Sequence, residues 1–270
     1  MNIAFQGDKG AFSEIMAIKF FPDADYIACK TFKDVFENVK TGKAKYGVIP
    51  IENSQTGRIV ETTELLVSSN LNICGEGMLN ILHCLITNKN NNLKNISKIY
   101  AHPETLTQCR NFLSKLNCEL VSWYDGAAAA KIVKNNEKLG LIASQRVAKL
   151  YDLKILKSGI QDSKENTTRF FIISKKKASS NGKDKTTLVF STKHQPGSLY
   201  RALNNFNNEN INLTRLESMP IKNKPWEYLF LIDLQGHIDD EKLKNALKQL
   251  KKNTTSIKIL GSYPIGKCYD

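Results

Sequence analysis

The chain has 270 residues, of which 41% are hydrophobic and 24% are charged, and its formal net charge is +13. This length and composition predict a folded globular protein with one large or two smaller domains, and disorder is not expected. The sequence has no secretory leader and no apolar window of roughly 18 residues, so we expect a cytoplasmic protein without a membrane span.

The basic charge raises the question of a nucleic-acid partner. Lysines are spread along the whole chain, with Lys175 to Lys177 as the only run of three, and no recognition motif accompanies them. A lysine-rich surface that attracts an anionic substrate is the favoured interpretation. The cysteines are far apart without a C-x-x-C pair, which predicts reduced structural thiols and no zinc site.

Taken in chain order, the residues before 175 alternate between short apolar strands and amphipathic helices. The pattern predicts strands at residues 2–6, 46–49, 81–87, 99–101, 119–122 and 140–143. It predicts helices that end near residue 20 or span 32–40, 60–68, 103–116 and 127–135. This alternation is typical of an α/β region with sheets flanked by helices.

Residues 175–185 form a polar stretch of small residues that separates two periodic regions. After it we expect, in order, a strand at 187–193, a helix at 198–208, strands at 212–219 and 228–234, a helix at 241–251 and a strand at 256–260. This βαββαβ order predicts a ferredoxin-like sandwich. The predicted domains are therefore residues 1–177 and 186–270.

Polar residues at strand ends are the candidates for chemistry in the first domain. Gly7 and Gly10 separate the first strand from the first helix, where backbone N–H groups can hold an anion or simply form a tight turn. Both the dinucleotide fingerprint and the P-loop motif are absent, so nucleotide binding is not expected. Glu52 to Ser54 follow a strand and either face a ligand or cap the next helix. His102 precedes Pro103 and is expected to be structural.

The first large region contains four motifs, which are Gly10-Ala11-Phe12-Ser13-Glu14, Pro50-Ile51-Glu52-Asn53-Ser54 with Gly57, His102-Pro103 with Gln108-Cys109-Arg110, and Asn166-Thr167-Thr168-Arg169-Phe170. In their order and spacing these motifs resemble the prephenate dehydratase family, and the resemblance covers essentially the whole chain. The second domain is similar to the ACT domain, an amino-acid-sensing module. The resemblance implies a two-lobed, periplasmic-binding-protein-like catalytic region followed by a ferredoxin-like ACT domain.

The implied activity is the decarboxylating dehydration of prephenate to phenylpyruvate in L-phenylalanine biosynthesis, a lyase reaction without metal or cofactor. Thr168 is predicted to donate a hydrogen bond to the leaving hydroxyl. Arg169 is assigned to the side-chain carboxylate of the substrate or to a contact with Glu52, which orients its neighbours. Asn53 completes the predicted catalytic set. The predicted substrate contacts are Gly10, Ala11, Ser13, Asn53, Ser54, Gln108 and Phe170.

The resemblance also implies feedback regulation by phenylalanine at an interface between ACT domains, and hence a homodimer or homotetramer. The implied regulatory residues are Gly197, Ser198, Leu199, Glu217 and Ser218. Met219 stands where relatives have arginine, which leaves the strength of inhibition open. In the catalytic region Ala101 replaces a serine and Asp125-Gly126 replaces two hydroxyl residues, so the local hydrogen bonds are open too.

Two alternative functions remain at this stage. Arogenate dehydratase carries out the same chemistry on a substrate whose side-chain ketone has become an amine, and the sequence alone shows no decisive ammonium partner. A sensor that binds an amino acid without catalysis would use the same two-lobed cleft and ACT domain. The presence of Thr168 with Glu52, Asn53 and Gln108 favours the enzyme over the sensor.

Overall fold

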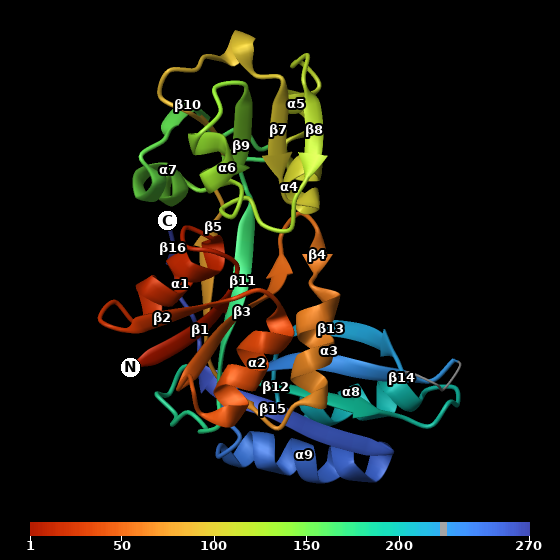
Figure 1. The fold of residues 1–270 in the computed structure, drawn as a ribbon. Coiled ribbons are helices and arrows are strands. Elements are labelled where there is room, and N and C mark those ends of the chain that lie inside the picture. Colours follow the sequence, from red (N-terminus) through yellow and green to blue (C-terminus); the bar gives the residue numbers. More distant parts are fainter. Residues whose placement is uncertain (222–225) are drawn as a thin grey trace. The chain divides into compact units, whose positions relative to one another are not determined.

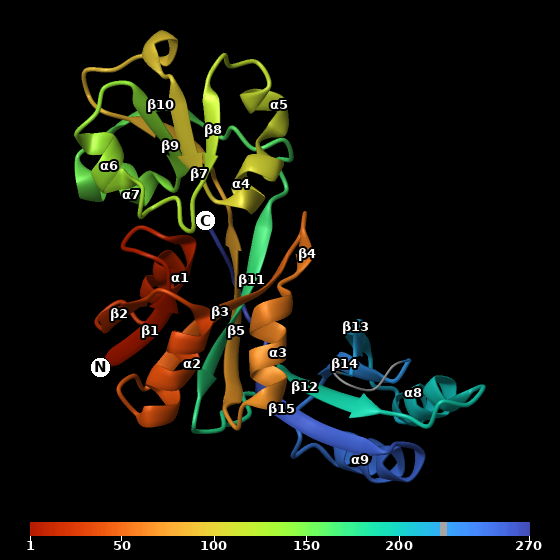
Figure 2. The same ribbon diagram turned by 45° about the vertical axis from the view of Figure 1, so that its right-hand side comes forward.

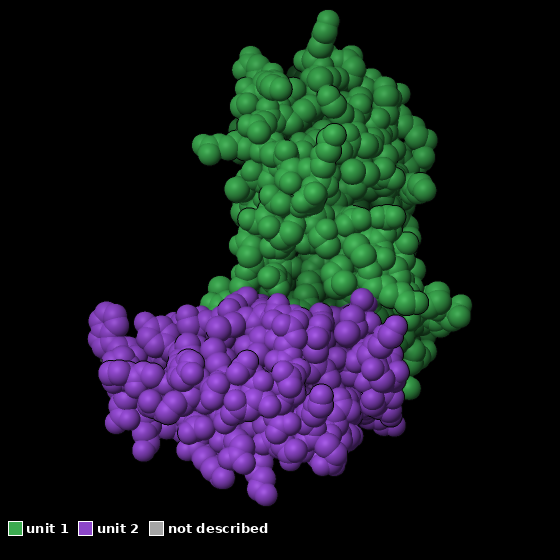
Figure 3. Space-filling model, turned by 180° about the vertical axis from the view of Figure 1, so that it is seen from behind, with its two compact units in different colours: residues 1–63, 77–171, 267–270 green, residues 64–76, 172–266 purple. Residues whose placement is uncertain are grey.

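The computed structural model describes residues 1–221 and 226–270, and Figure 1 shows their helices and strands as a ribbon. They divide into two compact units, coloured separately in Figure 3. The first unit contains Met1–Thr63, Gly77–Phe171 and Lys267–Asp270, and the second contains Glu64–Glu76 and Ile172–Gly266. The two units are defined by contacts in space and do not correspond to the ranges 1–177 and 186–270. The division of the chain into domains at those two ranges stays a prediction.

The first sheet is built around a parallel strand next to the N-terminus. Strand β1 (Asn2–Gln6) lies between β2 (Asp25–Cys29) and β3 (Tyr46–Asn53), in the order β16-β5-β11-β3-β1-β2, with β4 (Gly57–Arg58) paired to β3. Helices α1 (Phe12–Phe20) and α2 (Phe32–Thr41) follow β1 and β2. The other strands are β5 (Asn72–Asn80), β11 (Thr167–Ser174) and β16 (Cys268–Tyr269), and α3 is Val60–Ser68.

The second sheet of the first unit has the order β10-β6-β9-β7-β8. Its strands are β10 (Lys154–Ser158), β6 (Cys84–Thr87), β9 (Leu139–Ala143), β7 (Lys98–Ala101) and β8 (Glu119–Ser122). Successive residues of β6 and β9 pack alternately in two different hydrophobic cores. Leu141 packs with α6 (Ala130–Lys134) and α7 (Gln145–Tyr151), whereas Ile142 packs with α4 (Pro103–Gln108) and α5 (Arg110–Leu113). A short 3-10 helix, η1 (Leu93–Asn95), precedes β7. The first unit therefore has two α/β lobes (Figure 2).

The second unit contains an antiparallel sheet of order β13-β14-β12-β15. Its strands are β12 (Asp184–Ser191), β13 (Leu213–Pro220), β14 (Tyr228–Gln235) and β15 (Ser256–Pro264). Helices α8 (Ser198–Asn208) and α9 (Glu241–Asn253) pack on one face around Phe190, Phe206 and Leu250. The predicted βαββαβ order is confirmed, as is the two-lobed α/β region before it.

Several elements differ from the expectation for their segments. Strands β2, β5 and β10 and helix α7 were not predicted. The strand β5 contains Gly75 and Gly77 yet forms a nine-residue strand, since its neighbours in the sheet supply the hydrogen-bond partners. The helix expected at 103–116 breaks at Cys109, whose backbone leaves the helical region. Among residues 1–221 and 226–270, no helix has the length and apolarity that crossing a membrane requires.

Candidate active site

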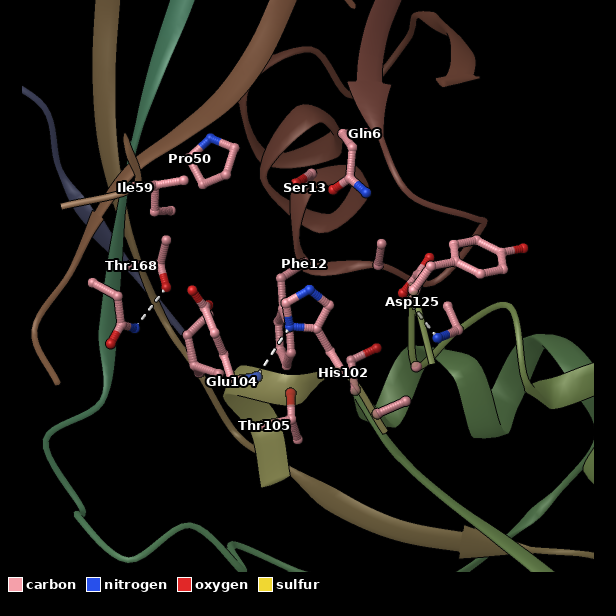
Figure 4. A pocket seen from close by; sticks show the side chains of 18 of the residues that line it. Gln6, Phe12, Ser13, Pro50, Ile59, His102, Glu104, Thr105, Asp125 and Thr168 are labelled. Carbon is pink, nitrogen blue, oxygen red and sulfur yellow. Dashed lines mark hydrogen bonds between the residues drawn. The ribbon is translucent and has the colours of Figure 1, made fainter. Parts of the chain in front are cut away.

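A cavity of about 360 Å³ lies within the first unit, and both lobes contribute to its lining (Figure 4). The first lobe provides the start of α1, the end of β3 and the start of β11, and the second provides the start of α4 and residues 124–127. Its apolar wall includes Phe12, Ile81 and Phe170, which suits a hydrocarbon ring. A ligand with one apolar ring and several anionic or hydroxyl groups fits this lining.

The hydroxyl of Thr168 accepts a hydrogen bond from Asn53, and its own hydrogen is directed away from Asn53. The side-chain oxygen of Asn53 accepts the backbone N–H groups of Gln55 at 2.9 Å and Thr56 at 3.1 Å. Because a backbone N–H can only donate, the amide nitrogen of Asn53 must face the other way, and it donates to Thr168 Oγ1 at 2.9 Å. Thr168 therefore accepts within the protein and keeps its own hydrogen for the cavity.

The same reasoning extends through three more side chains. Asn53 Nδ2 also donates to Asn166 Oδ1 at 2.8 Å, and Asn166 Nδ2 donates to Gln108 Oε1 at 2.9 Å. His83 Nε2 lies 2.8 Å from that oxygen, so this nitrogen is the donor and the ring is in the Nε2–H tautomer. Burial lowers the pKa of His83, which keeps the ring neutral, and its Nδ1 is buried without a hydrogen-bond partner.

The start of α1 forms the wall beside this network. No side chain caps the helix, so the first backbone N–H groups, at Phe12 and Ser13, are oriented towards an acceptor outside the helix. Gly10 precedes them with φ of +99°, and a β-carbon there would lie 2.5 Å from Val147 Cγ2, so this turn requires glycine. A substrate carboxylate can be held at this helix start.

Two buried contacts fix the helix start on the second lobe. Glu14 accepts the N–H of Gly10 at 2.8 Å and the guanidinium of Arg146 at 2.7 Å. The hydroxyl of Ser144 donates to the carbonyl of Gly10 at 2.6 Å. The bonds from Arg146 to Glu14 and from Ser144 to Gly10 join residues far apart in sequence, so the position of this turn depends on both lobes.

Asp125 contributes a buried carboxylate to the same cavity. Its Oδ2 accepts the N–H of Asp8 at 2.6 Å and its Oδ1 accepts the N–H of Ala127 at 3.0 Å. Burial is the main reason that the pKa of this carboxyl is raised, whereas the hydrogen bonds from the N–H groups of Asp8 and Ala127 lower it; the charge of Asp8 raises it and His102 lowers it by smaller amounts. Lys30 and His102 are the basic side chains that line the cavity beside the buried His83.

Most of the predicted substrate-site residues line the cavity. They are Gly10, Ala11, Ser13, Asn53, Gln108, Thr168 and Phe170. His102 caps α4 by accepting the N–H of Glu104 at 3.3 Å, in line with the structural role expected for it.

Three predicted residues do not line the cavity. Side chains alternate along β3 and β11, so Glu52 and Arg169 lie on the opposite faces of their strands from Asn53 and Thr168. Arg169 Nη1 lies 3.9 Å from Glu52 Oε2, and its guanidinium covers the ring of Phe171 at 4.8 Å. Ser54 donates to the carbonyl of Glu165 at 3.0 Å outside the cavity.

Lys30, His83, Asp125 and Asn166 are among the residues of the site that had no predicted role in it. His83 and Asn166 are distant from each other in sequence, and both bond the side-chain oxygen of Gln108. Asn166 belongs to the motif that contains Thr168, and this position in the motif is the sequence signal that could have indicated its role in the site. For Lys30 and His83 the sequence carries no local signal, since each lies outside the four motifs.

The predicted regulatory residues occupy two segments of the second unit. Gly197 caps α8 with φ of +76°, and Ser198 and Leu199 form the first turn of that helix. Glu217 and Ser218 lie on β13, an edge strand of the sheet, and Glu217 Oε1 accepts a hydrogen bond from Nε of Arg215 at 2.9 Å. Met219, which replaces the expected arginine, is buried.

In the part of the chain that the structure describes, no group of three His, Cys, Asp or Glu side chains has the arrangement of a metal site. All six cysteines are free thiols, and burial raises the pKa of Cys74 and Cys109 to about 12. These two thiols are therefore protonated and unreactive near neutral pH.

Two family models match the chain. The model described as prephenate dehydratase matches residues 3–178, and the model of the ACT domain matches residues 186–252. A bifunctional chorismate mutase/prephenate dehydratase of Aquifex aeolicus is 40% identical over 268 residues, which cover 98% of this chain and 74% of that protein. Arogenate dehydratase/prephenate dehydratase 2, chloroplastic, of Arabidopsis thaliana is 36% identical, with 98% and 73% covered.

Two solved structures have the same fold as this chain, each with a TM-score of 0.88. One is a prephenate dehydratase from Arthrobacter aurescens in complex with L-Phe, which is 29% identical, with 98% of this chain and 90% of that chain covered. The other is GqqA, described as a novel type of quorum quenching acylase, which is 33% identical, with 98% of both chains covered.

Proposed function

The chain belongs to the prephenate dehydratase family, and from this premise we propose that it converts prephenate to phenylpyruvate, carbon dioxide and water. The observation that carries the proposal is the hydroxyl of Thr168, which accepts from Asn53 and can donate into the cavity. The ring C–O bond breaks as the carboxylate leaves as carbon dioxide, and the electron pair of the broken C–C bond completes the aromatic ring. The departing hydroxide takes up one proton and becomes water.

Thr168 assists this step as a hydrogen-bond donor to the leaving hydroxyl. A threonine hydroxyl is a weak acid, so its contribution is a fixed direction and partial proton donation. The network of Asn53, Asn166, Gln108 and His83 holds that direction, since each amide in it is oriented by its neighbour. Solvent supplies the proton that finally forms water.

The start of α1 binds the side-chain carboxylate, and Lys30 adds a positive charge to the lining. The ring carboxylate lies against the apolar wall instead, because a cation held against it would stabilise the ground state more than the transition state. Glu52 and Arg169 form an ion pair that supports β3 and β11 from the other face. Their role is to position Asn53 and Thr168 rather than to contact substrate.

The second part of the proposal concerns regulation and assembly. We assign residues 1–177 to catalysis and 186–270 to an ACT domain that binds phenylalanine near Gly197 to Leu199 and Glu217 to Ser218. The relative from Arthrobacter aurescens was solved with L-Phe, which supports an amino-acid effector. We expect a cytoplasmic homodimer or homotetramer without a nucleic-acid partner.

An acylase activity is the second candidate, since it is the activity ascribed to GqqA. Hydrolysis of an amide by a hydroxyl nucleophile requires a general base beside it. Here His83 bonds Gln108 and His102 bonds the N–H of Glu104, and neither ring bonds a hydroxyl among the described residues. This arrangement favours the dehydratase.

The test is a comparison of substrates on the purified chain. Formation of phenylpyruvate from prephenate, followed by its ultraviolet absorbance, supports the proposal. Turnover of an N-acyl amide in the absence of prephenate turnover contradicts it and favours the acylase. Binding of amino acids without turnover of any substrate favours the sensor.

A further inference from the structure

We propose that Asp125 is a specificity-determining residue, whose carboxylate binds an ammonium group on the substrate side chain. The active site then accepts the α-amino acid form of the substrate, arogenate, in addition to the keto acid prephenate. The inference rests on the proposed dehydratase function and adds a residue that selects between its substrates.

The carboxylate of Asp125 is held in one orientation. The N–H groups of Asp8 and Ala127 each bond a different oxygen, at 2.6 Å and 3.0 Å. A carboxylate oxygen can accept more than one hydrogen bond, so each keeps accepting capacity for a ligand. Because the side chain lines the cavity, this capacity is available to a bound substrate.

The charge of Asp125 has no side-chain cation within ion-pair distance among residues 1–221 and 226–270. The charged groups near it are Asp8, which repels it, and His102, which attracts it. A buried carboxylate without a cation partner is costly, and burial accordingly raises the pKa of Asp125. A ligand ammonium group would supply the missing partner and form a charge-assisted hydrogen bond.

Asp125 also lies where the substrate side chain should be. Figure 4 shows Thr168 and Asp125 on opposite sides of the cavity, with Phe12 and His102 between them. The leaving hydroxyl and the side chain are attached to opposite carbons of the substrate ring. With the hydroxyl at Thr168, the side chain therefore extends towards Asp125.

The neighbouring turn completes a pair of contacts suited to an α-amino acid. Asp8, whose N–H binds Asp125, is three residues before Ala11, the N-cap of α1. The uncapped first turn of α1 faces a carboxylate, while Asp125 faces a cation. In an α-amino acid the carboxylate and the ammonium group are attached to the same carbon, so both contacts can form together. A keto acid can form only the first.

The experiment measures kcat/KM of the wild-type chain and of Asp125→Asn for arogenate and for prephenate. The wild-type chain should convert both substrates. The ratio of the two kcat/KM values, arogenate over prephenate, should fall by about 10- to 100-fold in the variant, since a hydrogen bond between charged groups is replaced by a neutral one. Glu61→Gln, which removes another acidic group lining the cavity, should leave this ratio unchanged.

An unchanged ratio in Asp125→Asn, or a wild-type chain that converts prephenate but not arogenate, overturns the inference and leaves the proposed function standing. Failure to convert either substrate refutes the proposed function and the inference with it. If Asp125→Asn does not fold, Asp125→Thr keeps an acceptor for one backbone N–H and should lower the ratio in the same direction. The comparison of substrates on the wild-type chain needs no variant.

Discussion

Replacing Asn53 by aspartate should reverse the direction of the Thr168 hydroxyl. The variant changes one NH2 group to an oxygen and hardly alters the shape. One carboxylate oxygen continues to accept the N–H groups of Gln55 and Thr56. The other faces Thr168 Oγ1, now 2.9 Å from an acceptor instead of a donor. Thr168 then donates to Asp at position 53, and its hydrogen is no longer available to the substrate.

The size of the effect follows from the bond that must be broken. A hydrogen bond to a charged group contributes roughly 1.5–3 kcal/mol, so releasing Thr168 to donate to the leaving hydroxyl should slow turnover by about 10- to 150-fold. The KM should change less, because the helix start and the apolar wall are untouched. The variant also loses the hydrogen bond that Asn53 Nδ2 donates to Asn166 Oδ1 at 2.8 Å, and this loss adds to the cost unless the amide of Asn166 rotates.

Steady-state assays on four proteins test this reasoning. They are the wild-type chain, Asn53→Asp, Thr168→Val and the double variant, each checked for folding by thermal denaturation. Once the hydroxyl is absent its direction is irrelevant, so Asn53→Asp should cost much less in the Thr168→Val background. A near-normal kcat for Asn53→Asp, or an equal cost in both backgrounds, would refute the assigned direction of the hydroxyl.

Four further predictions concern catalysis, cofactors, stability and regulation. Thr168→Ala should lower kcat and kcat/KM together by on the order of 10²–10⁴-fold, and Thr168→Ser should retain more activity in the same steady-state assay. Dialysis against a chelator and removal of nicotinamide cofactors should leave turnover unchanged, whereas activity restored by one metal would contradict this. Burial lowers the pKa of His83, so below about pH 6.5 the unfolded chain binds a proton that the folded chain does not. The free energy of unfolding, measured with urea, should therefore fall by up to about 1.4 kcal/mol per pH unit as the pH decreases below about 6.5. The variant His83→Gln should lack this contribution. Gly197→Val should weaken inhibition by phenylalanine, because the φ of +76° disfavours a branched side chain; absence of phenylalanine binding by calorimetry in the wild-type chain would show that the ACT domain has another role.

The sequence alone determined features that depend on neighbours along the chain. The βαββαβ order of the second domain followed from the periodicity of apolar residues, and helix α8 was predicted with its observed ends, Ser198 and Asn208. The resemblance to the family rested on short motifs, and each of those motifs contributes at least two residues to the lining of the cavity. Strand β5 was missed because its glycines weaken the local pattern, and only pairing within the sheet makes it a strand.

The tertiary structure decided which side chains of each motif meet and in which direction their hydrogens point. Motif membership could not separate Thr168 from Arg169, but the alternation of side chains along β11 places the first in the cavity and the second on the other face. The donor role of Thr168 depends on Asn53, which is 115 residues away in sequence. The carboxylate of Asp125 is oriented in the cavity by the N–H of Asp8, which is 117 residues away. Local propensity reports on near neighbours in sequence, whereas hydrogen-bond direction and uncompensated charge are properties of groups that only the fold brings together.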